Sequence, residues 1–133
     1  MRFQNKPLFQ LTALAALMGL TSLAMVACDG WFAQEQVIKI GHVGPLSGAI
    51  AHLGKDNENG ARMAIDALNA KGITIAGKKV KFILLPEDDA ANPQQATTVA
   101  QKLVDAKVSG VIGHLNSGTT IPASKIYNDA GIP

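Results

Sequence analysis

The chain has little of what binds a polyanion, builds a disulfide framework or forms a coiled coil. It contains one cysteine in 133 residues, its aromatic residues make up 5% of the sequence, and its charged residues make up 17%. One cysteine excludes a disulfide scaffold, and no heptad repeat is sustained. The formal charge is +2, but Arg2 and Lys6 are the only charged residues before Asp29. Residues 29–133 are therefore neutral, with no basic patch dense enough to follow a nucleic acid backbone.

The first 28 residues have the order of a secretory signal peptide. A positive start is followed by an uncharged run from Pro7 to Cys28 that is rich in Leu and Ala. An uncleaved membrane anchor is the alternative, because a run of this length could just span a bilayer. The polar and small residues within the run favour cleavage.

Two cleavage sites compete within this segment. Met25–Cys28 is similar to a lipobox, in which Cys28 is lipidated and becomes the new N-terminus, whereas Ser22–Ala24 has the small residues that ordinary signal peptidase reads. Cys28 would be discarded if the segment is removed whole. We predict a signal peptide at 1–28, a polar spacer at 29–36 and export to the periplasm. A lipid anchor on Cys28 is the alternative to a soluble form.

Beyond the spacer, strands alternate with helices, which predicts an α/β fold with an open parallel sheet and flanking helices. Strands are expected at 37–43, 80–85 and 108–113, with a small hairpin at 73–81 and a loop from 44 to about 55. Ile132–Pro133 is expected to lead into a further strand. The first helix is expected to end at Gly72, and its buried face is predicted to be Ala61, Ala64, Ile65 and Leu68.

Two further helices have recognisable starts. Asn92, Pro93 and Gln95 predict an N-cap, a first helical residue and a capping box. The last helix is expected to open at Asn116–Thr119 and to end at Gly131. The buried stripe of the earlier of the two helices is predicted to be Ala96, Val99, Ala100, Leu103 and Val104.

Ligands of open α/β sheets bind beyond the carboxyl ends of the strands. Three loops are therefore candidates, at 44–55, 86–92 and 114–119. The third opens a helix, where free amides and the helix dipole favour a carboxylate or phosphate, and Ser117 and Thr119 add hydroxyl groups. The spacing alone favours a simpler interpretation, in which Ser117 or Thr119 caps the helix.

Other polar residues suggest chemistry less strongly. Glu87, Asp88 and Asp89 could hold Mg²⁺ or a ribose, but a solvated acidic loop beside the next helix N-terminus is favoured. His42 and His114 could share a ligand, but without a third ligand two packed or hydrogen-bonded histidines are favoured. No catalytic triad spacing or phosphate-loop pattern is present, and the residues after Cys28 include no cysteine. The sequence predicts neither an enzyme nor a cofactor.

A series of short segments resembles the N-terminal lobe of periplasmic leucine/isoleucine/valine-binding proteins, the substrate-binding subunits of branched-chain amino-acid ABC importers. The resemblance implies a monomeric two-lobed clamshell that closes on an amino acid and docks on a membrane permease. A receptor ectodomain with the same fold is the alternative, and a flavodoxin-like or receiver enzyme is more distant. The matching segments are Ile40–Gly48, Gly54–Asp56, Asn59–Ala61, Asp88–Ala90, Asn92–Pro93, Val111–Leu115, Ser117, Pro122–Ser124 and Ile126–Tyr127.

The same resemblance implies which residues touch the ligand. Ser117 and the neighbouring amides are expected to hold the α-carboxylate, with Leu115, Asn116 and Thr119 in the same pocket. Leu53 stands where the family places an aromatic residue, so the preferred ligand side chain is open.

Two departures from the family follow. A disulfide found in many members would join Ala91 to Asn116, and both cysteines are absent here. Members of the family are much longer, and their second lobe contacts the ligand ammonium. Residues 37–133 are therefore expected to form part of the first lobe, with half a site and weak or no binding on its own.

Overall fold

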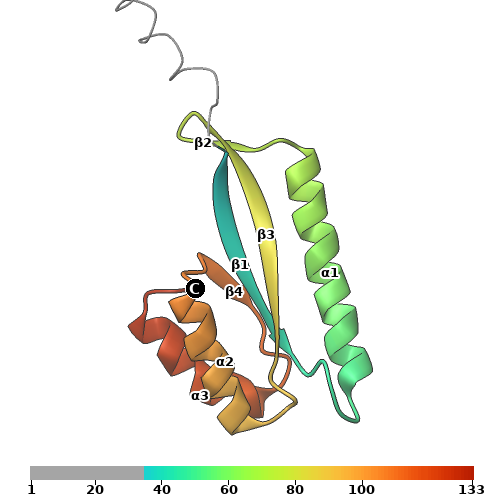
Figure 1. The fold of residues 1–133 in the computed structure, drawn as a ribbon. Coiled ribbons are helices and arrows are strands. Elements are labelled where there is room, and N and C mark those ends of the chain that lie inside the picture. The colour runs from blue at the N-terminus through green and yellow to red at the C-terminus, as the bar shows by residue number, and fades with distance from the viewer. Residues whose placement is uncertain (1–34) are drawn as a thin grey trace, which may run out of the picture. The chain divides into compact units, whose positions relative to one another are not determined.

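The computed structural model describes residues 35–133, which form one open sheet with helices on its two sides (Figure 1). The sheet has the order β2-β3-β1-β4, in which β3, β1 and β4 are parallel and β2 is antiparallel to β3. The predicted α/β class is confirmed. The elements are β1 (Gln36–Gly44), α1 (Ala51–Ala70), β2 (Thr74–Ile75), β3 (Lys78–Asp88), α2 (Pro93–Asp105), β4 (Gly110–Ile112) and α3 (Ser117–Asp129).

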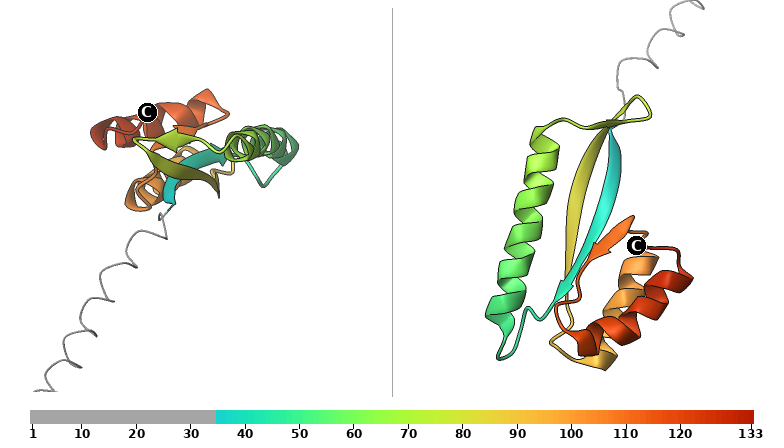
Figure 2. Two further views of the ribbon diagram at one scale, coloured as in Figure 1. Left: turned by 90° about the horizontal axis from the view of Figure 1, so that it is seen from above. Right: turned by 180° about the vertical axis from the view of Figure 1, so that it is seen from behind.

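The central strand β1 organises the sheet. It pairs along its whole length with β3, from Gln36 opposite Val80 to Gly44 opposite Asp88, whereas only three of its residues pair with β4. Helix α1 lies against β1 and β3 on one side, and α2 and α3 pack together on the other (Figures 1 and 2). This arrangement brings the loops that follow β1, β3 and β4 to one edge of the sheet, because parallel strands end on the same side.

The core lies between the sheet and the α2–α3 pair. The predicted stripe of α2 is buried except for Val104, which is only partly covered. The buried core cluster consists of Val43, Ala96, Val99, Ala100, Leu103, Val108, Ala123 and Tyr127.

Most predicted helix ends are confirmed, but the capping box is wrong. The side chain of Asn92 accepts hydrogen bonds from the amides of Gln94 and Gln95, and Pro93 begins α2. The side-chain amide of Gln95 instead donates to the carbonyl of Asp88 at 2.9 Å, because the amide of Asn92 is already bonded to Asp89. The tip of the predicted hairpin is confirmed, with Ala76 and Gly77 both at positive φ, as a tight two-residue turn requires.

Helix α1 begins at Ala51, so the loop predicted to reach about residue 55 is wrong. A Cβ on Gly54 would stand 2.1 Å from the carbonyl oxygen of Pro45, so only glycine lets this turn of helix lie against the end of β1. The buried residues of α1 are Gly54, Glu58, Ala61 and Ile65. Apolar periodicity could not reveal the first two, and it wrongly assigned Ala64 to the buried face, where the structure leaves it exposed.

The predicted strand ends also needed correction. Strand β3 continues through Pro86 to Asp88, because β2 pairs only with its first two residues and leaves an open edge where proline is tolerated. Strand β4 is shorter than predicted and stops before Gly113, which has φ +136 and lies against the backbone of Val43. The carbonyl of Pro133 accepts a hydrogen bond from the amide of Val111 at 2.9 Å, beside β4.

Candidate functional site

The N-terminus of α3 is open at the carboxyl edge of the sheet. Asn116 occupies the N-cap position with an extended backbone but makes no side-chain capping bond, and Ser117 and Gly118 are exposed. The first amides of a helix have no acceptor within the helix, so these groups and the helix dipole are available to an anion. Neither Ser117 nor Thr119 is the capping residue that the simpler interpretation predicted.

The hydroxyl groups that follow Ser117 are turned inward. Thr119 is only 1% exposed, and its hydroxyl donates to the carbonyl of Asn116 at 2.9 Å. The hydroxyl of Thr120 donates to the same carbonyl and to that of His114. These bonds fix the first turn of α3 to the loop before it, which leaves Ser117 as the exposed hydroxyl of that turn.

The other predicted ligand residues reach the same edge from two elements. Leu115 lies in the loop before α3 and is 37% exposed, and Leu53 lies in the first turn of α1 and is 46% exposed. The side-chain oxygen of Asn116 is buried without a hydrogen-bond partner. The carboxyl edge thus combines an uncapped helix N-terminus with exposed apolar side chains.

A buried polar chain that the sequence did not reveal lies directly beneath this edge. The Nδ1 atom of His114 is 2.8 Å from a carboxylate oxygen of Asp89, and its Nε2 atom is 3.2 Å from the hydroxyl of Tyr127. With its proton on Nδ1, the ring donates to Asp89 and accepts from Tyr127. Burial, with the nearby charge of Asp89, raises the pKa of Tyr127 to about 12, so the hydroxyl remains a donor.

The acidic residues at the end of β3 hold structure together, and the prediction of a solvated acidic loop is wrong. Glu87 forms an ion pair with Lys102 of α2, and Asp89 is fully buried. Asp88 accepts hydrogen bonds from the amides of Leu46 and Ala90, each at 2.8 Å. Burial acts to raise the pKa of Asp88, but hydrogen bonds from Ser47, Ala90 and Leu46 outweigh it and leave the pKa below its ordinary value.

His42 of β1 and Glu58 of α1 are two further buried polar side chains. His42 is 1% exposed, and its Nδ1 atom has no partner. Burial lowers its pKa, and the attraction of Glu58 offsets this only in part. Hydrogen bonds from Lys55 and Arg62 hold the pKa of Glu58 below its ordinary value. Within residues 35–133, no three His, Cys, Asp or Glu side chains gather as metal ligands would.

A hollow of about 580 Å³ lies at the outer edge of β4 and reaches His114 and Thr120. Val111, Tyr127 and Pro133 are among the residues that line it, but Ser117 and Leu53 are not. The residues that line the hollow do not include Ser117 or Gly118, which form the exposed start of α3. Among the described helices, none is both long and apolar enough to cross a membrane.

An open α/β sheet with an uncapped helix N-terminus at its carboxyl edge is an arrangement typical of ligand-binding lobes. The sequence profile described as periplasmic binding protein matches residues 37–133, so the chain belongs to that family. The described residues correspond to part of the N-terminal lobe of type I periplasmic binding proteins. Membership implies a periplasmic location, and the relatives are solute-binding proteins rather than enzymes.

The leucine-specific-binding protein of Salmonella typhimurium is 44% identical over 110 residues, which are 83% of this chain and 28% of that protein. The Leu/Ile/Val-binding protein of Escherichia coli is 45% identical over 95 residues, which are 71% of this chain and 25% of that protein. The chain therefore spans about a quarter of the length of these relatives.

Similar solved structures belong to proteins of the same kind. A branched-chain amino acid transporter substrate-binding protein from Streptococcus pneumoniae, in complex with isoleucine, matches with a TM-score of 0.66 and 35% identity over 74% of this chain and 28% of that chain. An ABC transporter substrate-binding protein from Desulfitobacterium hafniense, in complex with Leu, matches with a TM-score of 0.60 and 34% identity over 73% of this chain and 27% of that chain.

Proposed function

We propose that the protein is the solute-binding component of an ABC importer for branched-chain or related amino acids. In this proposal the ligand α-carboxylate lies at the N-terminus of α3, held by the hydroxyl of Ser117 and the free amides beside it. The observation that carries the proposal is the exposed, uncapped first turn of α3 at the carboxyl edge of the sheet. The isoleucine and leucine complexes of the related proteins support the ligand class.

The edge suits an amino acid with an aliphatic side chain. Leu53 and Leu115 offer exposed apolar surface at the same edge of the sheet as a helix N-terminus that favours negative charge. Asn116 lies between Leu115 and Ser117, and we place it in the pocket wall. Because the hydroxyl of Thr119 is bonded to the backbone, its proposed part is to shape the first turn of α3 around the ligand.

The described lobe supplies only one side of such a site. A carboxylate at a helix N-terminus gains about 0.3–1 kcal/mol when exposed and about 2 kcal/mol in favourable buried geometry. That is well short of the roughly 8 kcal/mol that micromolar binding needs. Residues 29–133 alone are therefore expected to bind leucine only weakly, in the millimolar range. Calorimetric titration that gave micromolar binding would contradict this half-site proposal.

A chimera tests the proposed carboxylate contact within a complete site. Residues 37–133 would replace the matching segment of the Salmonella typhimurium leucine-specific-binding protein, and leucine affinity would be measured by calorimetry. Ser117→Ala should weaken binding by about ten- to a hundredfold, because a hydrogen bond to a charged group contributes about 1.5–3 kcal/mol. Ser124→Ala is the matched control, since that exposed serine bonds only to the carbonyl of Ile121. Equal affinities for the Ser117 and Ser124 variants would overturn the contact.

Export completes the proposal. The segment 1–28, which lies outside the described residues, is proposed to be a signal peptide, followed by a spacer at 29–36 and the lobe from residue 37. Mass spectrometry of the exported chain distinguishes its possible forms. A lipid mass lost in Cys28→Ser indicates a lipoprotein, and a start after Ala24 indicates ordinary cleavage. The proposed partner is a membrane permease, and the proposed solution state is a monomer.

A further inference from the structure

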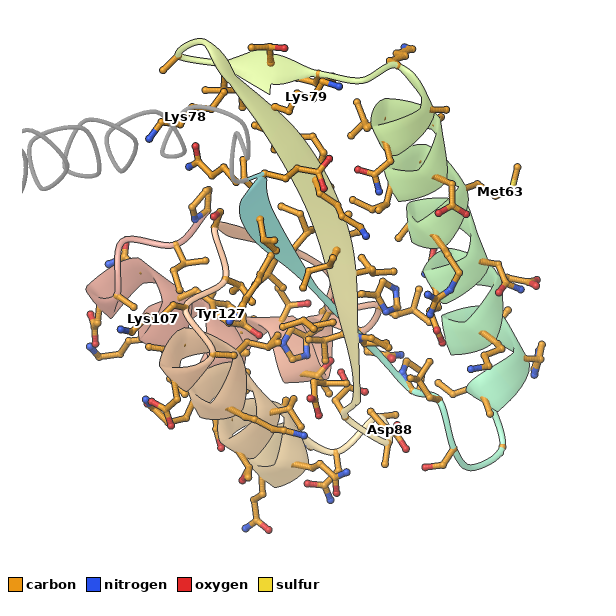
Figure 3. All side chains as sticks on the ribbon, turned by 45° about the horizontal axis from the view of Figure 1, so that its top comes forward. Met63, Lys78, Lys79, Asp88, Lys107 and Tyr127 are labelled. Carbon is orange, nitrogen blue, oxygen red and sulfur yellow. The ribbon has the colours of Figure 1, made fainter. Side chains whose placement is uncertain are left out.

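Two adjacent carboxylates at the end of β3 reach in different directions across the carboxyl edge. Asp88 is the last residue of β3, and Asp89 follows it directly. Successive side chains of a strand point to opposite faces, so neighbouring residues can serve different loops. Figure 3 shows Asp88 at the end of β3 opposite to Lys78 and Lys79, which is the end where the loops after β1 and β4 also lie.

Asp88 holds the loop that follows β1. One oxygen of its carboxylate accepts hydrogen bonds from the amide of Leu46 and from that of Ala90. Ser47 adds a further hydrogen bond to the same carboxylate. The loop after β1 and the turn after β3 are thus joined through one side chain, and Leu53 follows that loop in the first turn of α1.

Asp89 holds the loop that follows β4, from across the intervening strand β1. One of its oxygens accepts from the amide of Ala91 at 2.9 Å, and the other lies 2.8 Å from His114. His114 in turn bonds to Tyr127 of α3 through its ring and to Thr120 through its carbonyl. The helix that begins at Ser117 is therefore tied to His114 at two points and, through its ring, to Asp89.

Two of these bonds reach beyond the turn after β3. Asp88 bonds to Leu46 in the loop that leads to Leu53, and Asp89 bonds to His114 in the loop that carries Leu115 and leads to Ser117. The partners of the fully buried Asp89 are costly to separate, since each would lose its hydrogen bond away from water, and the partly exposed Asp88 makes charge-assisted hydrogen bonds, which are the stronger kind. The two loops are consequently held in place before any ligand arrives, which lowers the ordering cost of binding.

We propose that Asp88 and Asp89 are positioning residues that hold the loops after β1 and β4 in place and so pre-form the ligand edge around Ser117. This inference rests on the function proposed above. Neither residue is proposed to touch the ligand. Asp88 acts through Leu46 and Asp89 acts through His114.

The test uses the full chain labelled with ¹⁵N and compares three neighbouring acids. Amide hydrogen exchange reports how firmly each loop is held, and leucine-induced amide shifts at Ser117 and Gly118 report the site. Asp88→Ala should speed exchange at Leu46, and Asp89→Asn should speed exchange across 115–118. We expect each increase to reach about tenfold or more, because hydrogen bonds to charged groups are lost. Both variants should also raise the leucine concentration needed for half of the shift.

Two variants serve as controls. Glu87→Gln removes a partly exposed ion pair with Lys102, so exchange and leucine response should stay at wild-type values. Asp88→Asn keeps the oxygen that accepts from the amide of Leu46, so exchange at that amide should stay as slow as in the wild type. If Asp89→Asn does not fold, Tyr127→Phe breaks the same chain at its far end by removing one hydroxyl, and it should loosen 115–118 in the same way.

The outcomes separate this inference from the function on which it rests. Exchange that rises equally in α2 and in the loops, with an unchanged leucine response, would show that the acids serve stability alone and would overturn the positioning role. A wild-type chain whose amides do not respond to leucine would overturn the proposed carboxylate contact. In that case the loop-specific exchange pattern still decides whether Asp88 and Asp89 hold the two loops.

Discussion

The two ends of the sheet differ in how they treat polar groups. At the amino end, the β2–β3 hairpin leaves Lys78, Lys79 and Ile75 exposed, and β1 begins with exposed residues. At the carboxyl end, the last four residues of β1 are buried, and buried polar side chains gather around them. Figure 3 shows the two ends, with Lys78 and Lys79 at one end of β3 and Asp88 at the other. Burial of polar groups is costly unless they are bonded, so their concentration at one end marks where the fold holds its loops most firmly.

Close backbone packing at the carboxyl end gives the largest expected effect. Gly54→Ala should destabilise the protein by about 3 kcal/mol or more, because its Cβ would stand 2.1 Å from the carbonyl oxygen of Pro45. Gly60→Ala is the control on the same helix, since nothing lies within 4 Å of its Cβ. That change should stabilise α1 by about 0.5–1 kcal/mol. Urea unfolding measures both, and equal effects would contradict the packing argument.

An engineered disulfide can join the same two loops that the Asp89–His114 hydrogen bond joins. Ala91 and Asn116 each lie two residues after a member of the Asp89–His114 pair, and the family resemblance implies a disulfide at these two positions. The double change Ala91→Cys and Asn116→Cys, made with Cys28→Ser, should stabilise the oxidised chain by about 3 kcal/mol over the reduced one. The new side chain also removes the buried, unpartnered oxygen of Asn116. An oxidised chain no more stable than the reduced one would show that these loops do not meet as the resemblance implies.

Acid should lower the stability of the protein through His42, which lies at the carboxyl end of the sheet. Its folded-state pKa lies below the ordinary 6.5, so the unfolded chain takes up a proton first as the pH falls. Stability from this group is complete above pH 6.5 and is lost as the pH falls toward the folded-state pKa, by about 1.4 kcal/mol for each unit of difference. Glu58 and Asp88, whose pKa values are also lowered, lose their contributions only in more acidic solution, below 4.5 and 3.8.

The variant His42→Val isolates this effect. Urea unfolding between pH 5 and 7 should show a smaller loss of stability in acid than the wild type shows. An unchanged slope would assign the acid sensitivity to another group.

Substitution at the amino end should have the smallest effect. Lys79→Gln changes an exposed residue of the hairpin and should alter the free energy of unfolding by less than about 0.5 kcal/mol. Its leucine-induced amide shifts should equal those of the wild type. A loss of leucine response in this variant would remove the distinction between the two ends.

The sequence predicts those parts of the fold that depend on local patterns of apolar, capping and turn residues. The strand cores, the cap at Asn92, the hairpin tip and the stripe of α2 all follow local rules, and the structure confirms them. The start of α1 could not be predicted, because its buried face begins with Gly54 and Glu58 rather than with apolar residues.

The site was predictable only in part for a related reason. The helix N-terminus at Ser117 follows from a loop placed between a strand and a helix. The bond between Asp89 and His114 joins residues 25 positions apart, and no local pattern encodes such a pair. Acidic residues in sequence look alike, so only the fold distinguishes Glu87 at the surface from Asp89 in the interior.

The most direct measurement is an amide shift map of the ¹⁵N-labelled chain titrated with leucine and with leucinamide. If the ligand carboxylate binds at the N-terminus of α3, leucine should shift the amides of Ser117 and Gly118 at millimolar concentration, leucinamide should not, and the hairpin amides should stay in place. Equal shifts with both compounds, or shifts concentrated at the hairpin, would contradict the carboxylate site.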